Sequence, residues 1–570
     1  MRTAGSSAAP CFAWDIGRAG NNLLKKAAKS QRCPAGRINM AEADNMWKMP
    51  ASIFNDVIGP VMRGPSSSHT AASARIGEIV RQSVANEPLR AFCDFDVNGS
   101  LAATHEGHGT DMGFICGLLG KKLTEEGVDD YRRLAEKAGV GVEYRVFDYG
   151  ASHPNNYRIE LWGRGGEHHK WNGVSSGGGM IEMQDFDSFP VSIVGDFYEV
   201  LIKFPDAAAT ERMKKFCCGA LPAPDFSRVE EKAGGALLSL KFSKEPDEKT
   251  LKGAAESFGR TDFVKIAPVL PTLSRAGCSV PFATAEETLK YNEGKRLRMW
   301  ELAAEYEAAR GGTSKEEVFE TMSGIVEVME RALKNGLAGT EYADRILGPQ
   351  AHMIAEAGRR GALLPCDLLN AVIESITAIM ETKSAMGVIV AAPTAGSCGC
   401  LPGTLLGAAH ALGKSADEAT KAMLAAGLVG LYIAESATFA AEIAGCQVEC
   451  GAGSGMAAAG LVQLMGGSVE QCMDAASMAL QNVTGLACDF IAGRVEVPCL
   501  GKNVMGGANA LSCANMALAG FDRVIPLDET IAALYDAGQK LPSELRCTFG
   551  GLGKTPAAAK LLEKLKNIKK

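Results

Sequence analysis

The sequence predicts a multidomain protein with an N-terminal α/β (α+β) sandwich domain, a small ferredoxin-like α+β module and a C-terminal all-α domain. At 570 residues the chain is too long for one ordinary hydrophobic core. Apolar and polar residues alternate at 141–147 and 157–162, which indicates strands in the first half. After Thr313 strand patterns are nearly absent, and Ala, Gly, Met and Leu dominate. That composition indicates closely packed helices.

Changes in pattern along the chain predict five segments. They are an N-terminal extension at 1–50, the α/β domain at 51–190, the small module at 191–275, a helical linker at 276–312, and the all-α domain at 313–570.

The extension has an unusual charge balance, because residues 1–40 carry seven basic side chains and one acidic side chain, Asp15. This balance is typical of an organelle transit peptide. The alternative, which we favour, is a disordered or upstream stretch, with Met40, Met46 and Met49 as later starts. An odd count of 17 cysteines without small-loop spacings indicates a reducing compartment. We therefore expect a cytoplasmic protein, or a mitochondrial or related organellar one if the extension is a transit peptide.

Charge and hydropathy argue against two classes of partner. The net charge of −7 and the pI near 5.8 give no basic surplus for nucleic acid. The uncharged segment 387–411 is interrupted by Pro393, Pro402 and a Gly-Ser-Cys-Gly-Cys run, so we expect buried core there and no membrane span.

In the α/β domain, residues 64–70 place three serines and His69 directly before an amphipathic helix predicted at 71–85. Hydroxyls and free backbone N–H groups at the positive end of a helix bind anions. The alternative is a cap or a flexible loop.

A strand at 91–97 then leads to residues 107–111, where His108 stands between two glycines. Such a histidine can approach a ligand closely, and its pKa suits proton transfer. The alternative is a histidine that holds a turn by hydrogen bonds. We expect His105 to be a neighbour at the strand end, and 175–179 to form a tight turn.

The small module should run strand, helix, strand, helix, strand, at 199–204, 208–217, 236–242, 248–257 and 264–270. One charged helix at 286–310 should follow, ending at Gly311 and Gly312. Thr313 and Ser314 with Glu316 and Glu317 then predict the start of a new helix.

Three cysteines in the last third of the chain are separated by 41 and 10 residues: Cys446, Cys488 and Cys499. Helices predicted at 454–464 and 469–482, the second capped by Ser468 with Gln471, fold back on each other and return the chain to its start. The hairpin brings Cys488 near Cys446. The short segment that follows Cys488 then places Cys499 near the other two cysteines. We infer a metal or cluster site, the alternative being thiols that pack as small apolar side chains.

Several short sequence motifs resemble those of a known family. They lie at 64–70, 107–111 and 153–155 in the first half, and at 392–397, 445–447, 486–489 and 495–499 in the second. These motifs and the two cysteine spacings resemble those of the iron–sulfur-dependent L-serine dehydratases, also called L-serine ammonia-lyases. The resemblance is to the single-chain form, in which β-type and α-type domains are fused. The helical half would then be the all-α catalytic domain. The module at 191–275 stands where some members have an ACT-type domain, without a matching motif.

The resemblance implies a 4Fe–4S cluster held by Cys446, Cys488 and Cys499 with one open iron, and no pyridoxal phosphate. It implies that His69 and His108 orient substrate or transfer a proton, and that Lys502 neutralises cluster charge or reaches substrate. The implied substrate-binding residues are Ser66, Ser67, Ser68, Thr70, Thr394, Ala395, Gly396, Ser397 and Asn503. The substrate would be L-serine and the products pyruvate and ammonium, in amino-acid degradation and gluconeogenesis. We expect a homodimer.

The chain also departs from the family pattern. Residues 489–491 read Asp-Phe-Ile instead of Asp-Pro-Val, and 436–441 replace a usual Asn-Ala-Ser-Ile-Ser-Gly word. Threonine or another β-hydroxy amino acid is therefore an alternative substrate. Four further thiols, Cys398, Cys400, Cys450 and Cys547, are expected to pack in the core, with Cys398 or Cys450 as an alternative fourth ligand.

Two other functions compete with this one. A pyridoxal-phosphate dehydratase would need a Schiff-base lysine and a glycine-rich phosphate loop, and 177–179 has no lysine in such a context. A non-catalytic zinc protein or metabolite sensor fits poorly, because three thiols separated by helices do not make an ordinary structural zinc site.

Overall fold

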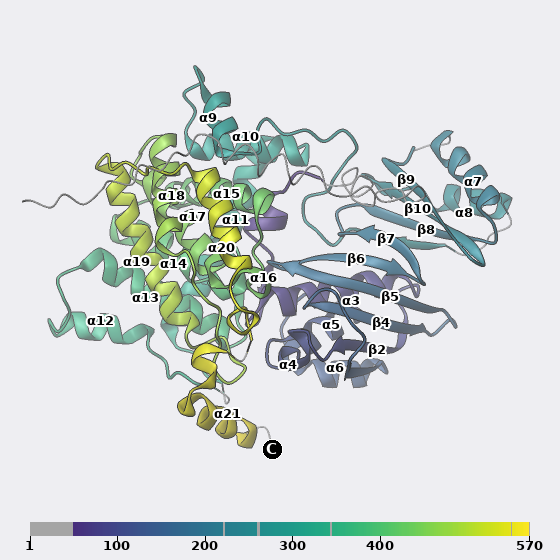
Figure 1. Cartoon of the computed structure of the whole chain (residues 1–570), viewed down its shortest axis with the longest axis horizontal. Coiled ribbons are helices and arrows are strands. Elements are labelled where there is room, and N and C mark those ends of the chain that lie inside the picture. The colour runs from purple at the N-terminus through teal and green to yellow at the C-terminus, as the bar shows by residue number, and fades with distance from the viewer. Residues whose placement is uncertain (1–48, 220–222, 259–262, 343–344, 549, 569–570) are drawn as a thin grey trace, which may run out of the picture. The chain divides into compact units, whose positions relative to one another are not determined.

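The computed structural model describes residues 49–570 except 220–222, 259–262, 343–344, 549 and 569–570. The predicted extension at 1–50 therefore lies outside the described residues, apart from its last two. In the described part, the two larger sheets and their helices lie beside a larger group of helices (Figure 1).

A six-stranded sheet with the order β3-β2-β4-β5-β6-β7 forms the core of the first half. Only β2 and β3 are parallel. Helices α3 (Ala72–Gln82) and α5 (Thr110–Leu118) pack together on the sheet, and Ile76 and Ile79 join Phe95 and Trp171 in one apolar cluster. The strands are β2 Pro88–Asp96, β3 Gly141–Phe147, β4 Asn156–Gly163, β5 His168–Gly177, β6 Met180–Phe186 and β7 Phe189–Ile193.

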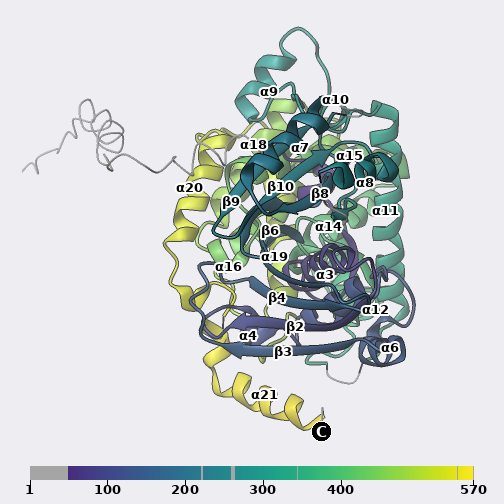
Figure 2. The same cartoon turned by 90° about the vertical axis from the view of Figure 1, so that its right-hand side faces the viewer.

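The small module has the element order βαββαβ, which is that of a ferredoxin-like unit. Its antiparallel sheet has the order β11-β8-β10-β9, and Figure 2 looks onto the strands of both sheets. The five elements expected from sequence are present, but the expected order was wrong in omitting β9. That edge strand is rich in charge and half-exposed on both faces, so it lacks alternation. The elements are β8 Tyr198–Phe204, α7 Ala207–Gly219, β9 Phe226–Lys232, β10 Gly235–Phe242, α8 Glu248–Ser257 and β11 Val264–Ile266.

The single charged helix expected at 286–310 was also wrong, since two helices occupy the region: α9 (Ala285–Asn292) and α10 (Met299–Gly311). The chain breaks between them, where Gly294 and Arg296 both have positive φ and the Asn292 amide bonds the backbone of Leu297. Buried side chains of α10 pack in the main core, so this stretch is part of the helical body.

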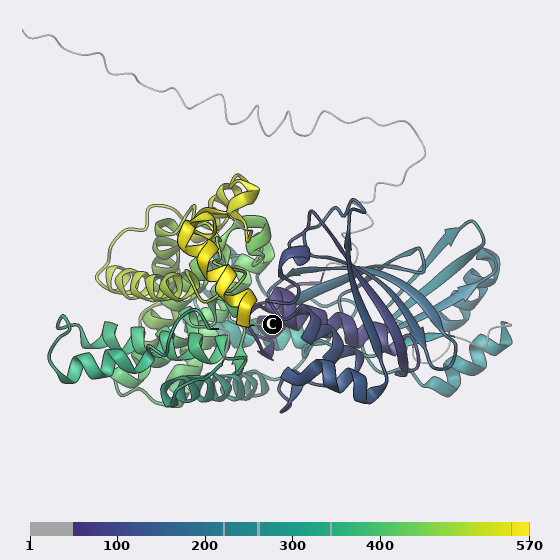
Figure 3. The ribbon, with the colours of Figure 1, turned by 90° about the horizontal axis from the view of Figure 1, so that it is seen from below.

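In its described residues the second half is a body of helices with one short strand. Figure 3 shows these helices beside the sheet half. Helix α18 has the predicted bounds and the predicted Ser468 and Gln471 capping box, whereas α17 starts at Cys450 and not at 454. The elements are α11 Lys315–Ala338, α12 Ala351–Arg359, α13 Asp367–Ser384, β12 Val388–Val390, α14 Cys400–Ala411, α15 Ala416–Ser436, α16 Ala441–Ala444, α17 Cys450–Leu464, α18 Val469–Asn482, α19 Cys499–Leu518, α20 Leu527–Gln539 and α21 Pro556–Ile568.

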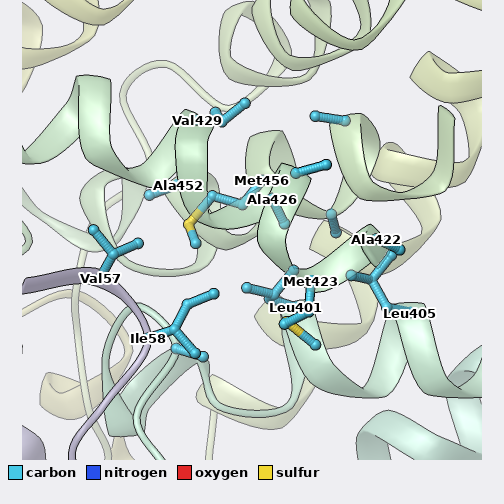
Figure 4. Close-up of a cluster of buried hydrophobic side chains, with 14 of the residues drawn as sticks. Val57, Ile58, Leu401, Leu405, Ala422, Met423, Ala426, Val429, Ala452 and Met456 are labelled. Carbon is cyan, nitrogen blue, oxygen red and sulfur yellow. The ribbon is translucent and has the colours of Figure 1, made fainter. Parts of the chain in front are cut away.

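Small residues in α15 let the start of the described chain enter the helical core. A Cβ on Gly430 would lie 2.1 Å from Val57 Cγ1, and one on Gly427 would lie 2.9 Å from Ile53 Cγ2. The short helix η1 (Ile53–Val57) therefore fits against α15, and Figure 4 shows Val57 and Ile58 among the side chains of the helical body. Residues 387–411 form β12 and α14 and are largely buried, and no helix in the described part of the chain is long and apolar enough to cross a membrane.

A two-stranded sheet joins the halves and positions the site. Strand β1 (Val61–Arg63) pairs antiparallel with β12, with Val61 opposite Val390 and Arg63 opposite Val388. The serine-rich loop begins directly after β1, and the Thr394 turn follows soon after β12. The pairing therefore brings two segments that are over 300 residues apart in the chain to one place.

Candidate active site

The serine-rich loop is held by hydrogen bonds that use its hydroxyl groups. Residues Ser67–Ala71 form the short helix η2. The Ser67 hydroxyl oxygen accepts the backbone N–H of Ala395 (3.1 Å), and the Ser68 hydroxyl donates to the Glu442 carboxylate (3.0 Å). Both contacts cross from the sheet half to the helical half. The loop is thus fixed against the helical body.

His69 has a defined tautomer in this network. Its Nε2 lies 2.8 Å from Thr104 Oγ1, whose own hydrogen is donated to the Ser100 carbonyl (2.7 Å). Nε2 must therefore donate, and Nδ1 accepts the Ser66 hydroxyl at 2.8 Å. Burial lowers the pKa of His69 to about 3, so the ring is neutral.

His108 lies beside His69, with ring centroids 4.7 Å apart, and also touches the Phe490 ring at 5.3 Å. It is 1% exposed, and neither ring nitrogen has a hydrogen-bond partner among the described residues. Burial lowers its pKa well below the ordinary value. A buried neutral imidazole with two free nitrogens is suited to meet a ligand.

The loop around His108 depends on Gly109, which has φ +84° and is the N-cap residue of α5. A Cβ there would lie 2.4 Å from Thr70 Oγ1. The Thr70 hydroxyl donates to the His108 carbonyl (2.9 Å) and so holds this loop to the serine-rich one. His105, the expected neighbour, is paired with Asp111 at 2.7 Å.

Four thiols gather in one buried cluster with Phe490: Cys446, Cys450, Cys488 and Cys547. The Cys446 sulfur is in hydrogen-bond contact with Cys450 and Cys488, which holds the pKa of Cys446 well below its usual range. Cys488 in turn contacts Cys547. The helix hairpin thus returns Cys488 to Cys446, as the spacing predicted.

Cys499 is the first residue of α19 and is buried, but it packs with the main core and not with the other four thiols. The Cys446 charge acts on it, since burial and Cys446 both raise the pKa of Cys499. Among the described residues, no three His, Cys, Asp or Glu side chains already form a metal-binding group. The set of Cys446, Cys488 and Cys499 as ligands stays a prediction.

The further thiols are distributed unequally. Cys450 and Cys547 lie within the cluster, whereas Cys398 meets Met380 (4.0 Å) and Cys400 donates toward the Cys450 carbonyl (3.6 Å). Cys547 has φ +57°, a backbone conformation that non-glycine residues rarely adopt. Its N–H donates to the Cys488 carbonyl at 2.9 Å.

The Thr394 turn and the residues after Cys499 form one hydrogen-bonded unit. Thr394 donates to Glu449 (2.8 Å), and burial together with Cys446 raises the pKa of Glu449 well above its usual range. Asn503 is fully buried; it accepts the Cys400 N–H (2.8 Å) and donates to the Gly396 carbonyl (2.9 Å). Its amide positions the turn, so its predicted contact with substrate would require exchange of these bonds.

Lys502 bonds to the two residues on either side of Cys488. Its ammonium donates to Asp489 (2.6 Å) and to the Ala487 carbonyl (2.7 Å). Although burial lowers it, the Cys446 and Asp489 charges hold the pKa of Lys502 above its ordinary value. Lys502 is therefore a cation beside the thiols, and its two predicted roles, neutralising cluster charge or reaching substrate, stay predictions.

Sequence reasoning missed three ionisable residues of this site: Glu442, Glu449 and Lys383. The first two flank Cys446 at four residues before and three after, and this spacing was the available signal. Lys383 is fully buried near the end of α13, where a single lysine in a buried stretch was the available signal.

The donors fit an iron–sulfur group. Thiolates are the ligands that such clusters take, and Cys446 favours its thiolate form in a buried group of side chains that also holds Cys488, with Cys499 within reach of its charge.

Known proteins match both halves of the chain. Residues 294–552 match the family described as serine dehydratase alpha chain, and 56–145 match the family described as serine dehydratase beta chain. The probable L-serine dehydratase alpha chain of Bacillus subtilis is 37% identical over 285 residues, 50% of this chain and 95% of that protein. The probable beta chain of the same organism is 40% identical over 159 residues, covering 28% and 70%. L-serine dehydratase 1 of Escherichia coli is 27% identical over 503 residues, covering 86% and 95%.

A sheet half and a helical half that meet at paired histidines and buried thiols, with these matches, define an enzyme of the lyase class. The chain belongs to the serine dehydratase family, in the form that carries the alpha-chain and beta-chain regions on one polypeptide.

Proposed function

We propose that this protein dehydrates L-serine to pyruvate and ammonium at a site built by both halves, with a 4Fe–4S cluster held by Cys446, Cys488 and Cys499. The observation that carries the proposal is the meeting of His108 with the thiol segment. The His108 ring contacts Phe490, which belongs to the same apolar cluster as Cys446 and Cys488. When bound, the cluster would supply a Lewis-acidic iron that makes the β-hydroxyl a better leaving group.

The two histidines have different roles in the remaining chemistry, one in positioning the serine-rich loop and the other in proton transfer. Both nitrogens of His69 are engaged, so His69 orients Ser66 and the loop that carries it. Both nitrogens of His108 are free, so His108 is the side chain available to take the α-proton. Its low pKa makes it a weak base in the resting site, and burial of the substrate beside it would keep water away from the transfer.

The electrostatics of the site favour one thiolate, that of Cys446, since contact with Cys446 raises the pKa of Cys488 and burial raises that of Cys499. Lys502 places positive charge beside Cys446 and Cys488, whereas Glu449 favours its protonated form. Release of water from serine would leave aminoacrylate, which tautomerises and hydrolyses to pyruvate without further protein groups. This product fits the expected role in amino-acid degradation and gluconeogenesis.

Threonine is the second candidate substrate. Phe490 packs directly on His108 and stands where the family pattern has proline, so this wall of the site differs from that of the family. A homodimer in the cytoplasm remains our expectation for the assembly and its location.

Anaerobic purification with iron and sulfide assays, followed by a screen of hydroxy amino acids for keto-acid release, tests the proposal. We expect pyruvate from L-serine and less 2-oxobutanoate from L-threonine. Zinc without sulfide and no keto acid from any substrate would contradict it.

A further inference from the structure

Lys383 is a buried cation without a carboxylate partner. It lies near the C-terminal end of α13 and is 0% exposed. Its ammonium donates one hydrogen bond, to the Val495 carbonyl at 2.7 Å. Within the described residues no carboxylate oxygen lies within 4.0 Å of it.

Such an arrangement is costly unless an anion completes it. Removing an ammonium group from water is unfavourable, and two of the three N–H donors of Lys383 have no acceptor among the described residues. The buried Lys241 of the small module shows the usual solution, a pair with Glu199 at 2.8 Å. The free donors of Lys383 therefore call for a negatively charged ligand.

Lys383 lies at the wall of a cavity between the two halves, because its hydrogen-bond partner Val495 lines that cavity. Val495 lines a cavity of about 350 Å³ together with Ser384, the residue next to Lys383. Gly107 and Gly109, which flank His108, line the same cavity, and so does Pro65, which precedes Ser66. The Lys383 ammonium group is thus hydrogen-bonded to a residue that lines this cavity, and the same cavity borders the loops that carry His69 and His108.

The other groups that could hold an anion here are already occupied. Lys502 pairs with Asp489 at 2.6 Å, and Arg494 pairs with Glu496 at 3.5 Å. The hydroxyls of the serine-rich loop have protein partners, as described above. The positive charge of Lys383 also reaches the thiol side, because it opposes the rise in the pKa of Cys499 and of Glu449.

We propose that Lys383 binds the carboxylate of the amino-acid substrate and so sets the affinity for α-amino acids. This inference rests on the proposed function only in taking an amino acid as the substrate. In this arrangement the carboxylate binds Lys383 beside the cavity that borders the histidine loops, which leaves the β-hydroxyl free to face the thiols.

Binding of an unreactive ligand tests this role apart from catalysis. L-Alanine has the carboxylate but no β-hydroxyl, and L-alaninamide lacks the negative charge. Ligand-observed NMR titrations of both compounds would use cluster-loaded wild type, Lys383→Met, Lys383→Arg and the control Lys414→Met, whose lysine pairs with Glu418 away from the site. Iron and sulfide would be measured on every sample.

We expect wild type and Lys414→Met to prefer L-alanine to L-alaninamide. Lys383→Met should bind L-alanine about 10- to 100-fold more weakly with its iron content unchanged, and lose the preference, as expected for a charge-assisted hydrogen bond. Lys383→Arg should keep part of the preference, and it carries the test if the methionine variant does not fold.

Three results would overturn the assignment. They are unchanged L-alanine binding in Lys383→Met, an equal loss for L-alanine and L-alaninamide, or loss of iron, which would make Lys383 a counter-charge for the thiols. Failure of the proposed function would look different: a wild type that prefers L-alanine through Lys383 but forms no pyruvate from L-serine would refute dehydration and keep the carboxylate site.

Discussion

His69 and His108 lie edge to face with their ring centroids 4.7 Å apart, yet among the described residues His69 has hydrogen-bond partners for its ring and His108 has none. One histidine is thus held by the protein, and its neighbour is left for a ligand. Because both rings are buried and neutral, their different surroundings decide their roles.

Replacing His108 should separate activity from stability. In His108→Leu an apolar side chain removes two unsatisfied buried nitrogens, so we expect the free energy of unfolding to rise by about 1 kcal/mol or more. Keto-acid release should fall at least about 100-fold, as when a general base is removed. Urea unfolding and turnover of the same preparation measure both effects. Unchanged turnover would contradict the role of His108.

Gly109→Ala tests the contact between the two loops. The new Cβ meets Thr70 Oγ1 in a left-handed conformation, so we expect a loss of stability of about 1–3 kcal/mol and weaker turnover. Gly127→Ala is the matched control, since Gly127 has φ +77° but open space around its Cβ position. Equal thermal midpoints for the two variants would show that the clash with Thr70 has no effect.

Acid should destabilise the protein through His69. The pKa of His69 is lowered to about 3 in the folded chain from an ordinary 6.5, so between these values the unfolded chain binds more protons. The stability that comes from neutral His69 is complete above pH 6.5 and is lost as the pH falls toward 3, by at most about 1.4 kcal/mol per pH unit.

Unfolding free energies of wild type and His69→Gln at pH 7.5 and 5.5 would measure this dependence. We expect the wild type to lose more stability than the variant on acidification. The same loss in both proteins would show that His69 titrates normally in the folded state.

Individual cysteine replacements test the ligand set. Cys446→Ala, Cys488→Ala and Cys499→Ala should lose iron and activity together, whereas Cys472→Ala, in α18 away from the cluster, should keep both. Cys450→Ala should keep most of its activity. If Cys450→Ala or Cys547→Ala releases the iron while Cys499→Ala retains it, the cluster uses a different third thiol.

Local signals explain what was predictable in the fold. Helix α18 followed from Ser468 and Gln471 because a capping box is written within four residues. The break between α9 and α10 depends on the positive φ of Gly294 and Arg296. The charged edge strand β9 depends on its pairing with β10. Neither of these features has a periodic pattern of its own.

At the site, residue identities could be predicted but partners could not. The spacing of Cys446 and Cys488 implied their contact, and the glycines around His108 implied a close approach to a ligand. The bond from Ser68 to Glu442 and the missing ion pair of Lys383 arise from contacts between distant segments. Such contacts depend on the pairing of β1 with β12, which no short stretch of sequence encodes.

Stepwise reconstitution of the cluster in iron-free protein tests the central proposal most directly, with pyruvate formation from L-serine measured at each iron content. We expect activity to rise in proportion to iron and sulfide and to level off near about four iron atoms per chain. Full activity in the iron-free chain, or activity that follows an absorbance near about 410–420 nm typical of pyridoxal phosphate, would contradict it.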